Sequence, residues 1–156
     1  MVVAKSAGTL RFAPARGEDA PVIFGFAKEL MERYESDPEI DLGMALSWTR
    51  RKIEGRLGEY TRVTQNGETV AFYRFAPEGE EMELDDLYVL PAFRGRGIGT
   101  AIVKRCCGLT DKPLFLYVFE QNERAVALYR RLGFLVRERV SPTRLILARP
   151  GAPKGA

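Results

Sequence analysis

The sequence of 156 residues contains no histidine. This absence excludes Ser-His and Cys-His nucleophilic machinery, histidine general bases and zinc sites that need imidazole. Proton transfer in this protein therefore has to use carboxylates, lysine, tyrosine, cysteine or water.

Cysteine is scarce: Cys106 and Cys107 are adjacent and are the only two in the chain. Two neighbouring thiols provide no disulfide framework and no structural zinc site, so we expect a reducing, cytoplasmic environment and no metal. The sequence also lacks a long apolar run. Its first ten residues, MVVAKSAGTL, do not resemble a signal peptide, and we expect a soluble protein without a membrane partner.

Charge of one sign is not in large excess, because 24 basic residues face 21 acidic ones, for a net charge of +3. A mixed solvated surface accounts for this balance better than a nucleic-acid interface does. The length and composition are typical of one globular domain spanning 1–156, with loose ends at 1–8 and 149–156.

Hydrophobic periodicity and turn residues, including the Asn66-Gly67 pair and the segment Pro77 to Gly79, predict an order of elements for the middle of the chain. Antiparallel hairpins precede a parallel crossover, which indicates an α/β (α+β) fold with a mixed sheet and helices on its faces. Strands are expected at 9–13, 60–65, 68–75, 82–90, 113–118, 134–140 and 143–148, and helices at 19–34, 41–56, after the loop 94–99, and after Asn122.

The loop Arg94-Gly95-Arg96-Gly97-Ile98-Gly99 connects a predicted strand to a predicted helix. Backbone N–H groups and the positive end of the helix dipole converge at such a junction and favour a pyrophosphate. The dinucleotide and P-loop fingerprints are both absent. A flexible turn with incidental arginines is the alternative interpretation.

Carboxylates are concentrated just upstream, from Glu78 to Asp86. Glu78 to Glu81 are typical of a solvated turn. Period-2 alternation, however, places Glu83 and Asp85 on one face of a strand with Leu87 and Val89. Acids on a largely buried element are costly unless they have a role. Beside an anion-binding loop, they indicate a site for an anionic cofactor and a cationic substrate.

Two stretches resemble the motifs of the Gcn5-related N-acetyltransferase (GNAT) superfamily. LYVLPAFRGRGIGTAIV looks like motif A, and NERAVALYRRLGF, from Asn122 to Phe134, looks like motif B. The resemblance covers residues 9–148. It implies a mostly antiparallel central sheet of six to seven strands, about four helices, and acetyl-CoA as co-substrate. Ala71 departs from the family, which often has glycine there.

The resemblance also implies roles for individual residues. Tyr129 would be the general acid, and the base would be Asp85, as in the polyamine acetyltransferase branch, or Glu83, as in the histone acetyltransferase branch. The cofactor would bind the backbone of the splayed strand, the loop and one helix cap, namely Leu87, Tyr88, Val89, Arg94, Gly95, Arg96, Gly97, Ile98, Gly99, Thr100 and Asn122.

We therefore expect an enzyme that acetylates a small-molecule or peptide amine by direct attack in a ternary complex. Three alternatives remain open. Tyr129 falls on the apolar stripe of its helix and could be a core residue. A GNAT-like domain could bind acyl-CoA as a sensor without turnover, and the RGRG stretch could contact nucleic acid. The sequence leaves the acceptor undefined, and a homodimer is neither indicated nor excluded.

Overall fold

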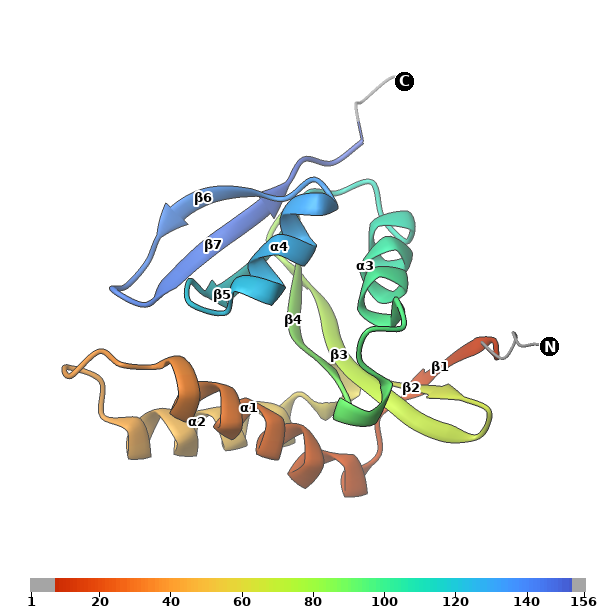
Figure 1. Cartoon of the computed structure of the whole chain (residues 1–156), viewed down its shortest axis with the longest axis horizontal. Helices are drawn as coiled ribbons and strands as arrows, with labels where there is room; N and C mark the ends of the chain where they lie inside the picture. The colour runs from red at the N-terminus through yellow and green to blue at the C-terminus, as the bar shows by residue number, and fades with distance from the viewer. Residues whose placement is uncertain (1–7, 153–156) are drawn as a thin grey trace.

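The structure is a computed structural model, and it describes residues 8–152. Within this range the chain forms seven strands and four α-helices, which Figure 1 labels. The strands are β1 (Leu10–Pro14), β2 (Tyr60–Gln65), β3 (Glu68–Glu78), β4 (Glu81–Val89), β5 (Leu114–Phe119), β6 (Leu135–Arg139) and β7 (Arg144–Arg149). The α-helices are α1 (Ala20–Tyr34), α2 (Leu42–Gly55), α3 (Ile98–Gly108) and α4 (Glu123–Arg131).

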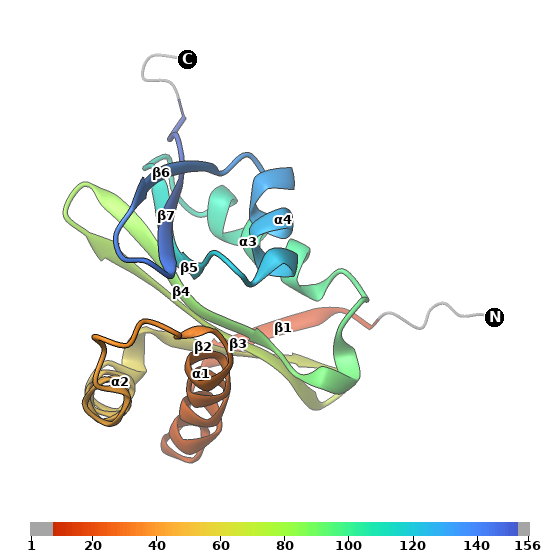
Figure 2. The ribbon, with the colours of Figure 1, turned by 60° about the vertical axis from the view of Figure 1, so that its left-hand side comes forward.

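The strands form one sheet in the order β1-β2-β3-β4-β5-β7-β6. Only β4 and β5 pair in parallel among the described strands, and the other neighbours are antiparallel. This arrangement confirms the predicted mixed, mostly antiparallel sheet. Figure 2 shows α1 and α2 on one face of the sheet and α3 and α4 on the other.

Each face of the sheet buries its own apolar cluster, which holds the helices in place. The α1–α2 side packs Ile23, Ala27 and Ile53 against Tyr60, Phe72 and Tyr88. The opposite side packs α3 and α4 against the strands and includes Ile102, Cys106, Tyr129 and Phe134. Predicted site residues belong to both clusters, Tyr129 to the α3–α4 side and Tyr88 to the α1–α2 side.

The turns follow the predicted chemistry with one correction. Asn66 and Gly67 have φ values of 52° and 81°, as a type I′ hairpin turn requires. The turn expected at Pro77 to Gly79 falls at Gly79 and Glu80, because β3 continues to Glu78 with Pro77 opposite Met82. Met82 N donates to Pro113 O on the other side of β4, so the missing N–H of Pro77 interrupts no hydrogen bond with its partner.

A bulge in β4 overturns the predicted alternation of its side chains. Asp86 has φ of +49°, and the register with β3 shifts between Asp85 and Tyr88. Leu87 and Val89 consequently pack against the α3–α4 core, whereas Asp85 contacts α2. The prediction that the acids share a face with Leu87 and Val89 was wrong, because a residue in the left-handed region breaks the period of two.

The same strand separates from its neighbour beyond the bulge. The parallel pairing of β4 with β5 is limited to Met82–Leu114 and Glu83–Phe115, and the two strands diverge afterwards, as Figure 1 shows. The edge of β4 from Asp85 to Val89 therefore faces an opening in the sheet. A splayed strand at this position is what the resemblance implied.

Of the predicted loose ends, residues 1–7 and 153–156 lie outside the described range. Arg149 belongs to β7, and Ala152 N donates to Asp111 O at 2.9 Å, so the ordered chain continues further than expected. None of the helices in the described range combines the length and the apolarity that crossing a membrane requires.

Candidate active site

A groove of about 630 Å³ lies at the N-terminus of α3, and we call it the loop groove. Gly95 and Gly97 adopt φ values of 78° and 80°, which glycine reaches without the steric penalty of a Cβ. Gly97 is the N-cap of α3, so the N–H groups of Ile98, Gly99 and Thr100 have no acceptor within the helix. Such amides, with the helix dipole, form an anion site suited to a pyrophosphate.

Most of the residues predicted to bind the cofactor line this groove. They are Val89, Arg94, Gly95, Gly97, Ile98, Gly99, Thr100 and Asn122. Asn122 also caps α4 through a 3.4 Å hydrogen bond from Ala125 N. Arg96 is not among the lining residues. Its guanidinium lies over the ring of Phe93, 5.4 Å from the centroid.

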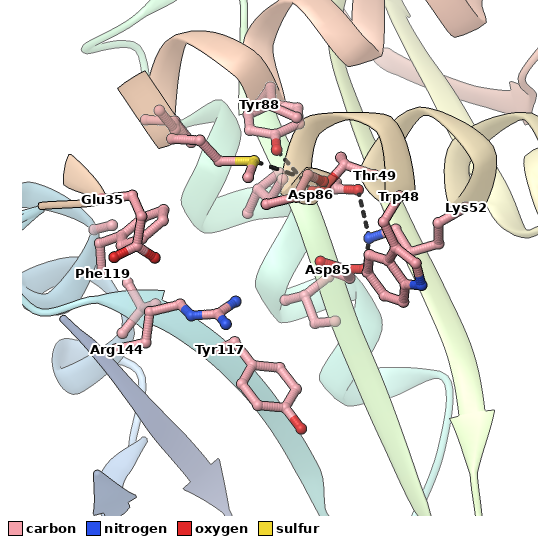
Figure 3. A pocket seen from close by; sticks show the side chains of 18 of the residues that line it. Glu35, Trp48, Thr49, Lys52, Asp85, Asp86, Tyr88, Tyr117, Phe119 and Arg144 are labelled. Atoms are coloured by element: carbon pink, nitrogen blue, oxygen red, sulfur yellow. Dashed lines mark hydrogen bonds and ion pairs between the residues drawn. The ribbon is translucent and has the colours of Figure 1, made fainter. Parts of the chain in front are cut away.

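A second space of about 330 Å³, the central cavity, lies between α1 and α2 on one side and β4, β5, α4 and the start of β7 on the other. Figure 3 shows the side chains that enter it. Leu87 and Tyr88, expected near the cofactor, line this cavity. Leu30 and Ala125 line both spaces, so the groove and the cavity meet at these residues.

Asp86 anchors a hydrogen-bonded cluster on the α2 side of the central cavity. The hydroxyls of Tyr60 and Tyr88 donate to its carboxylate at 2.5 and 2.7 Å, and Lys52 Nζ donates at 3.1 Å. Burial, followed by the negative charge of Asp86, raises the pKa of both phenols. The phenols therefore stay protonated as donors, and the carboxylate of Asp86 is fixed in place.

Asp85 has a different environment from its neighbour. Its carboxylate accepts hydrogen bonds from Lys52 Nζ at 2.7 Å and from Arg74 at 3.3 Å. Burial, with a contribution from the charge of Asp86, raises the pKa of Asp85 to about 6, although Lys52 opposes the shift. A carboxylate with this pKa is ionised at neutral pH and is more basic than an ordinary aspartate.

Lys52 bridges the two aspartates, because its Nζ lies within ion-pair distance of both Asp85 and Asp86. Figure 3 labels the three side chains. Burial lowers its pKa, but the charges of Asp86 and Asp85 outweigh that effect and raise it overall. The ammonium group therefore remains charged and compensates part of the negative charge of the cluster.

Glu83 lies apart from the central cavity and is not among its lining residues. It forms an ion pair with Arg74 at 3.0 Å, and Arg74, which is 1% exposed, also contacts Glu59 and Asp85. Burial lowers the pKa of Arg74, but its hydrogen bonds to Glu59 and Glu83 and the charges of Asp85 and Glu83 outweigh this effect and raise it. Of the two candidate bases, Asp85 is the one that the fold presents to the cavity.

Tyr129 is buried on α4 and lines the central cavity across from the aspartates. Its ring packs edge-on against Phe134, with the centroids 5.6 Å apart. Burial, followed by the charge of Asp85, raises the pKa of its hydroxyl. The phenol is therefore protonated at neutral pH. Its packing against Phe134 holds it in the wall of the central cavity.

The cysteines lie away from this chemistry. Cys106 is fully buried in the α3–α4 core, and burial raises the pKa of its thiol to about 12. Burial also raises the pKa of Cys107, which packs against the same core. A protonated thiol is a poor nucleophile. Among residues 8–152, no group of three potential metal-ligating side chains is close enough to hold a metal ion.

Several residues of the central cavity were not identified from the sequence. Lys52, Asp86 and Arg144 line it, but they come from α2, the bulge and the start of β7, and no motif connects them. The acidic side chains between α1 and α2 form mostly local hydrogen bonds. Asp41 caps α2 and Asp37 accepts from Glu39 N, whereas Glu35 lines the cavity.

The model of the "Acetyltransferase (GNAT) family" matches residues 24–134 of this chain. The chain belongs to the GNAT acetyltransferase family. This membership confirms the resemblance carried by the two motifs, which predicts acetyl-CoA as co-substrate. The loop groove, with its left-handed glycines and free amides, fits the anionic end of that molecule.

Individual GNAT relatives match only part of the chain. It is 42% identical over 60 residues to the thialysine N-epsilon-acetyltransferase of Bos taurus, which is 36% of this chain and 35% of that protein. It is 40% identical over 78 residues to a peptidyl-lysine N-acetyltransferase of Salmonella typhimurium, covering 49% of this chain and 50% of that protein. The matches to these curated relatives thus span about a third to a half of their lengths.

Solved GNAT structures share the fold at low sequence identity. The PaiA N-acetyltransferase of Thermoplasma acidophilum in complex with coenzyme A superposes with a TM-score of 0.68 at 16% identity, over 91% of this chain and 99% of the other. The ribosomal-protein-S18-alanine N-acetyltransferase of Escherichia coli gives a TM-score of 0.64 at 24% identity, over 94% and 97%. These similarities concern the arrangement of the backbone.

Proposed function

We propose that this GNAT protein transfers the acetyl group of acetyl-CoA directly to a primary amine in a ternary complex, with Asp85 as base and Tyr129 as acid. The observation that carries the proposal is the central cavity, which both residues line and which meets the loop groove at Leu30 and Ala125. An amine in the cavity and a thioester entering from the groove would meet between the two residues.

The proposal gives Asp85 the task of removing a proton from the acceptor. An alkylamine with a pKa of about 10.4 is neutral to about 1 part in 2,500 at pH 7. A carboxylate with a pKa of about 6, directly or through a water molecule, would take the proton of the ammonium group as the nitrogen becomes the nucleophile. The absence of Glu83 from the cavity lining argues for Asp85 rather than Glu83.

Tyr129 would complete the proton balance. The amine nitrogen forms a bond to the carbonyl carbon, the carbon–sulfur bond breaks, and the phenol of Tyr129 donates its proton to the departing sulfur. The nitrogen loses its second proton to water as the adduct collapses, and solvent reprotonates the phenolate and takes the proton from Asp85. The products are an acetamide, coenzyme A and one net proton. The raised pKa of Tyr129 supports this role, because the hydroxyl has its proton at neutral pH. The backbone of Leu87, Tyr88 and Val89 is proposed to bind the pantetheine arm along the open edge of β4.

The named relatives support a primary amine at the end of a flexible chain as acceptor, since the printed names describe acetylation of thialysine and of peptidyl-lysine. The decisive assay is release of free thiol from acetyl-CoA with a panel of amines, combined with thermal stabilisation by coenzyme A. Amine-dependent release is expected. Stabilisation by coenzyme A without release for any amine would instead favour a sensor that binds acyl-CoA without turnover.

A further inference from the structure

Arg144 enters the central cavity as an unpaired cation. Its Nε is buried and has no hydrogen-bond partner within residues 8–152, and no ion pair of that range includes it. Arg62 is the other arginine whose buried Nε lacks a partner, but its guanidinium has Asp19 Oδ2 at 3.7 Å. Arg144 as a whole is half-buried, but a buried N–H donor without an acceptor is unfavourable, so this Nε calls for an explanation.

The position of Arg144 is fixed by its backbone. Arg144 is the first residue of β7, opposite Phe119 of β5, and its N–H donates to Ser141 Oγ at 3.1 Å. Figure 3 shows its guanidinium pointing into the space between Glu35 and the group formed by Asp85 and Lys52. The cation is thus held at the opposite side of the cavity from the proposed base.

The two cations of the central cavity differ in their partners. Lys52 is occupied by Asp85 and Asp86, whereas the donors of Arg144 remain available. A guanidinium binds a carboxylate through two parallel hydrogen bonds, and these charge-assisted bonds are stronger than neutral ones. Glu35 lies beside Arg144 in the cavity, and its negative charge would repel a dianion such as phosphate more than a monoanion.

We propose that Arg144 binds a carboxylate of the acceptor, so that the substrate is a small amino-acid-type molecule carrying both a primary amine and a carboxylate. This inference rests on the proposed function. The carboxylate would sit on Arg144 while the amine reaches Asp85. A polyamine, suggested by the resemblance of the β4 stretch to that branch of the family, would instead bring a second cation towards Arg144.

The test uses acceptors that differ only by a carboxylate: lysine against cadaverine, ornithine against putrescine, and 2,4-diaminobutyrate against 1,3-diaminopropane. For the pair of best length, we expect kcat/KM to be about 10- to 100-fold higher for the amino acid, as charge-assisted hydrogen bonds allow. In Arg144→Gln this preference should fall to nearly one, through a higher KM for the amino acid and a lower KM for the diamine, whose second ammonium group no longer faces the guanidinium. Arg144→Lys should recover part of it.

Arg139→Gln is the matched control, because Arg139 lies in the same β6–β7 hairpin but pairs with Glu120 at the surface at 2.7 Å. It should keep the full preference, and thermal unfolding should show that both glutamine variants are folded. Equal use of amino acids and diamines, or a preference that survives Arg144→Gln, would overturn the inference. Faster turnover of O-phosphoethanolamine would assign the anion as phosphate and overturn the carboxylate. If no amine releases thiol, the proposed function itself fails, and the inference fails with it.

Discussion

The loop groove and the central cavity are built in different ways. The groove is also lined by α1 and α4, but its proposed anion-binding groups are backbone amides of one continuous stretch, Arg94–Thr100, which contains two left-handed glycines. The cavity is formed by side chains from α1, α2, β4, β5, α4 and β7. The loop amides are therefore encoded locally, whereas the cavity exists only once the fold has brought distant residues together.

This difference separates what the two regions contribute. A backbone site recognises a phosphate group by geometry and helix dipole, and it serves any member of a family that uses the same cofactor. A cavity lined by side chains changes whenever one of these residues is substituted, so its charges would select which acceptor binds. In this protein Lys52, Asp85, Asp86, Glu35 and Arg144 supply those charges.

The largest expected effect is that of Tyr129→Phe, which separates turnover in the central cavity from cofactor binding in the loop groove. Loss of the phenol proton should lower kcat by about 10²- to 10⁴-fold, the usual contribution of a positioned acid. The retained ring keeps its contact with Phe134, so the affinity for acetyl-CoA should not change. Steady-state kinetics and calorimetric titration with coenzyme A measure the two quantities separately.

Tyr73→Phe is the control for this variant, because Tyr73 is a buried phenol in the same core. It should retain wild-type turnover. Equal losses of stability and activity in Tyr129→Phe would show that Tyr129 is a core residue without a catalytic role.

A second test compares the two acids of β4. Asp85→Asn should lower kcat/KM by about 10²- to 10³-fold, because it removes the base that the cavity presents. In the wild-type protein, kcat/KM should rise with pH through about 6, where Asp85 loses its proton, and the variant should lack this limb. Initial rates between pH 5 and 8 provide the profile.

Glu83→Gln is the matched comparison, since Glu83 contacts Arg74 but does not line the cavity. Its kcat/KM should fall several-fold at most, with the pH limb preserved. The pKa of Asp85 is higher in the folded than in the unfolded protein, so at pH 8 its negative charge disfavours the folded state. The thermal unfolding midpoint of Asp85→Asn at pH 8 should therefore be no lower than that of the wild type. A larger loss in Glu83→Gln than in Asp85→Asn would reverse the assignment of the base.

The sequence predicted most of the fold because its signals are local. The Asn66–Gly67 turn, the Asn122 cap and the apolar periodicity of α1 and α4 were sufficient to define the elements. The bulge at Asp86 was not predicted from the alternation of side chains, because an aspartate in the left-handed region leaves no periodic signal. That single residue changes which face of the sheet Leu87 and Val89 occupy.

The candidate site also contains residues with local sequence signals and residues without them. Asp85, Tyr129 and the loop could be identified from contiguous motifs, and most of the predicted loop residues line the groove. Lys52, Tyr60 and Arg74 could not be identified, because their importance comes from ion pairs and hydrogen bonds with β4 across long sequence separations. Only the packing of α2 and β3 against β4 brings these partners together.

A third prediction addresses the backbone nature of the loop groove. Gly97→Ala forces a Cβ into a residue with φ of +80° and should raise KM for acetyl-CoA by about tenfold, while KM for the amine stays constant. Gly58→Ala is the control, because Gly58 is also uncrowded but has no positive φ. An unchanged KM for acetyl-CoA in Gly97→Ala would contradict the role assigned to the loop amides.

The smallest expected effect concerns Lys52, which lowers the pKa of Asp85 against the effect of burial. Lys52→Met should raise that pKa, so the acidic limb of kcat/KM should move to higher pH and activity should fall more at pH 6 than at pH 8. Arg51→Met, on the same helix but bonded only to Ser47 among its described neighbours, should leave the limb in place. A shift to lower pH would contradict the coupling.

Direct transfer in a ternary complex is the central claim, and mass spectrometry of the intact protein tests it most directly. After incubation with acetyl-CoA alone, the protein mass should be unchanged, and adding the amine should yield free coenzyme A and acetylated amine in equal amounts. A covalent acetyl-enzyme that forms without the amine and disappears when the amine is added would contradict the account.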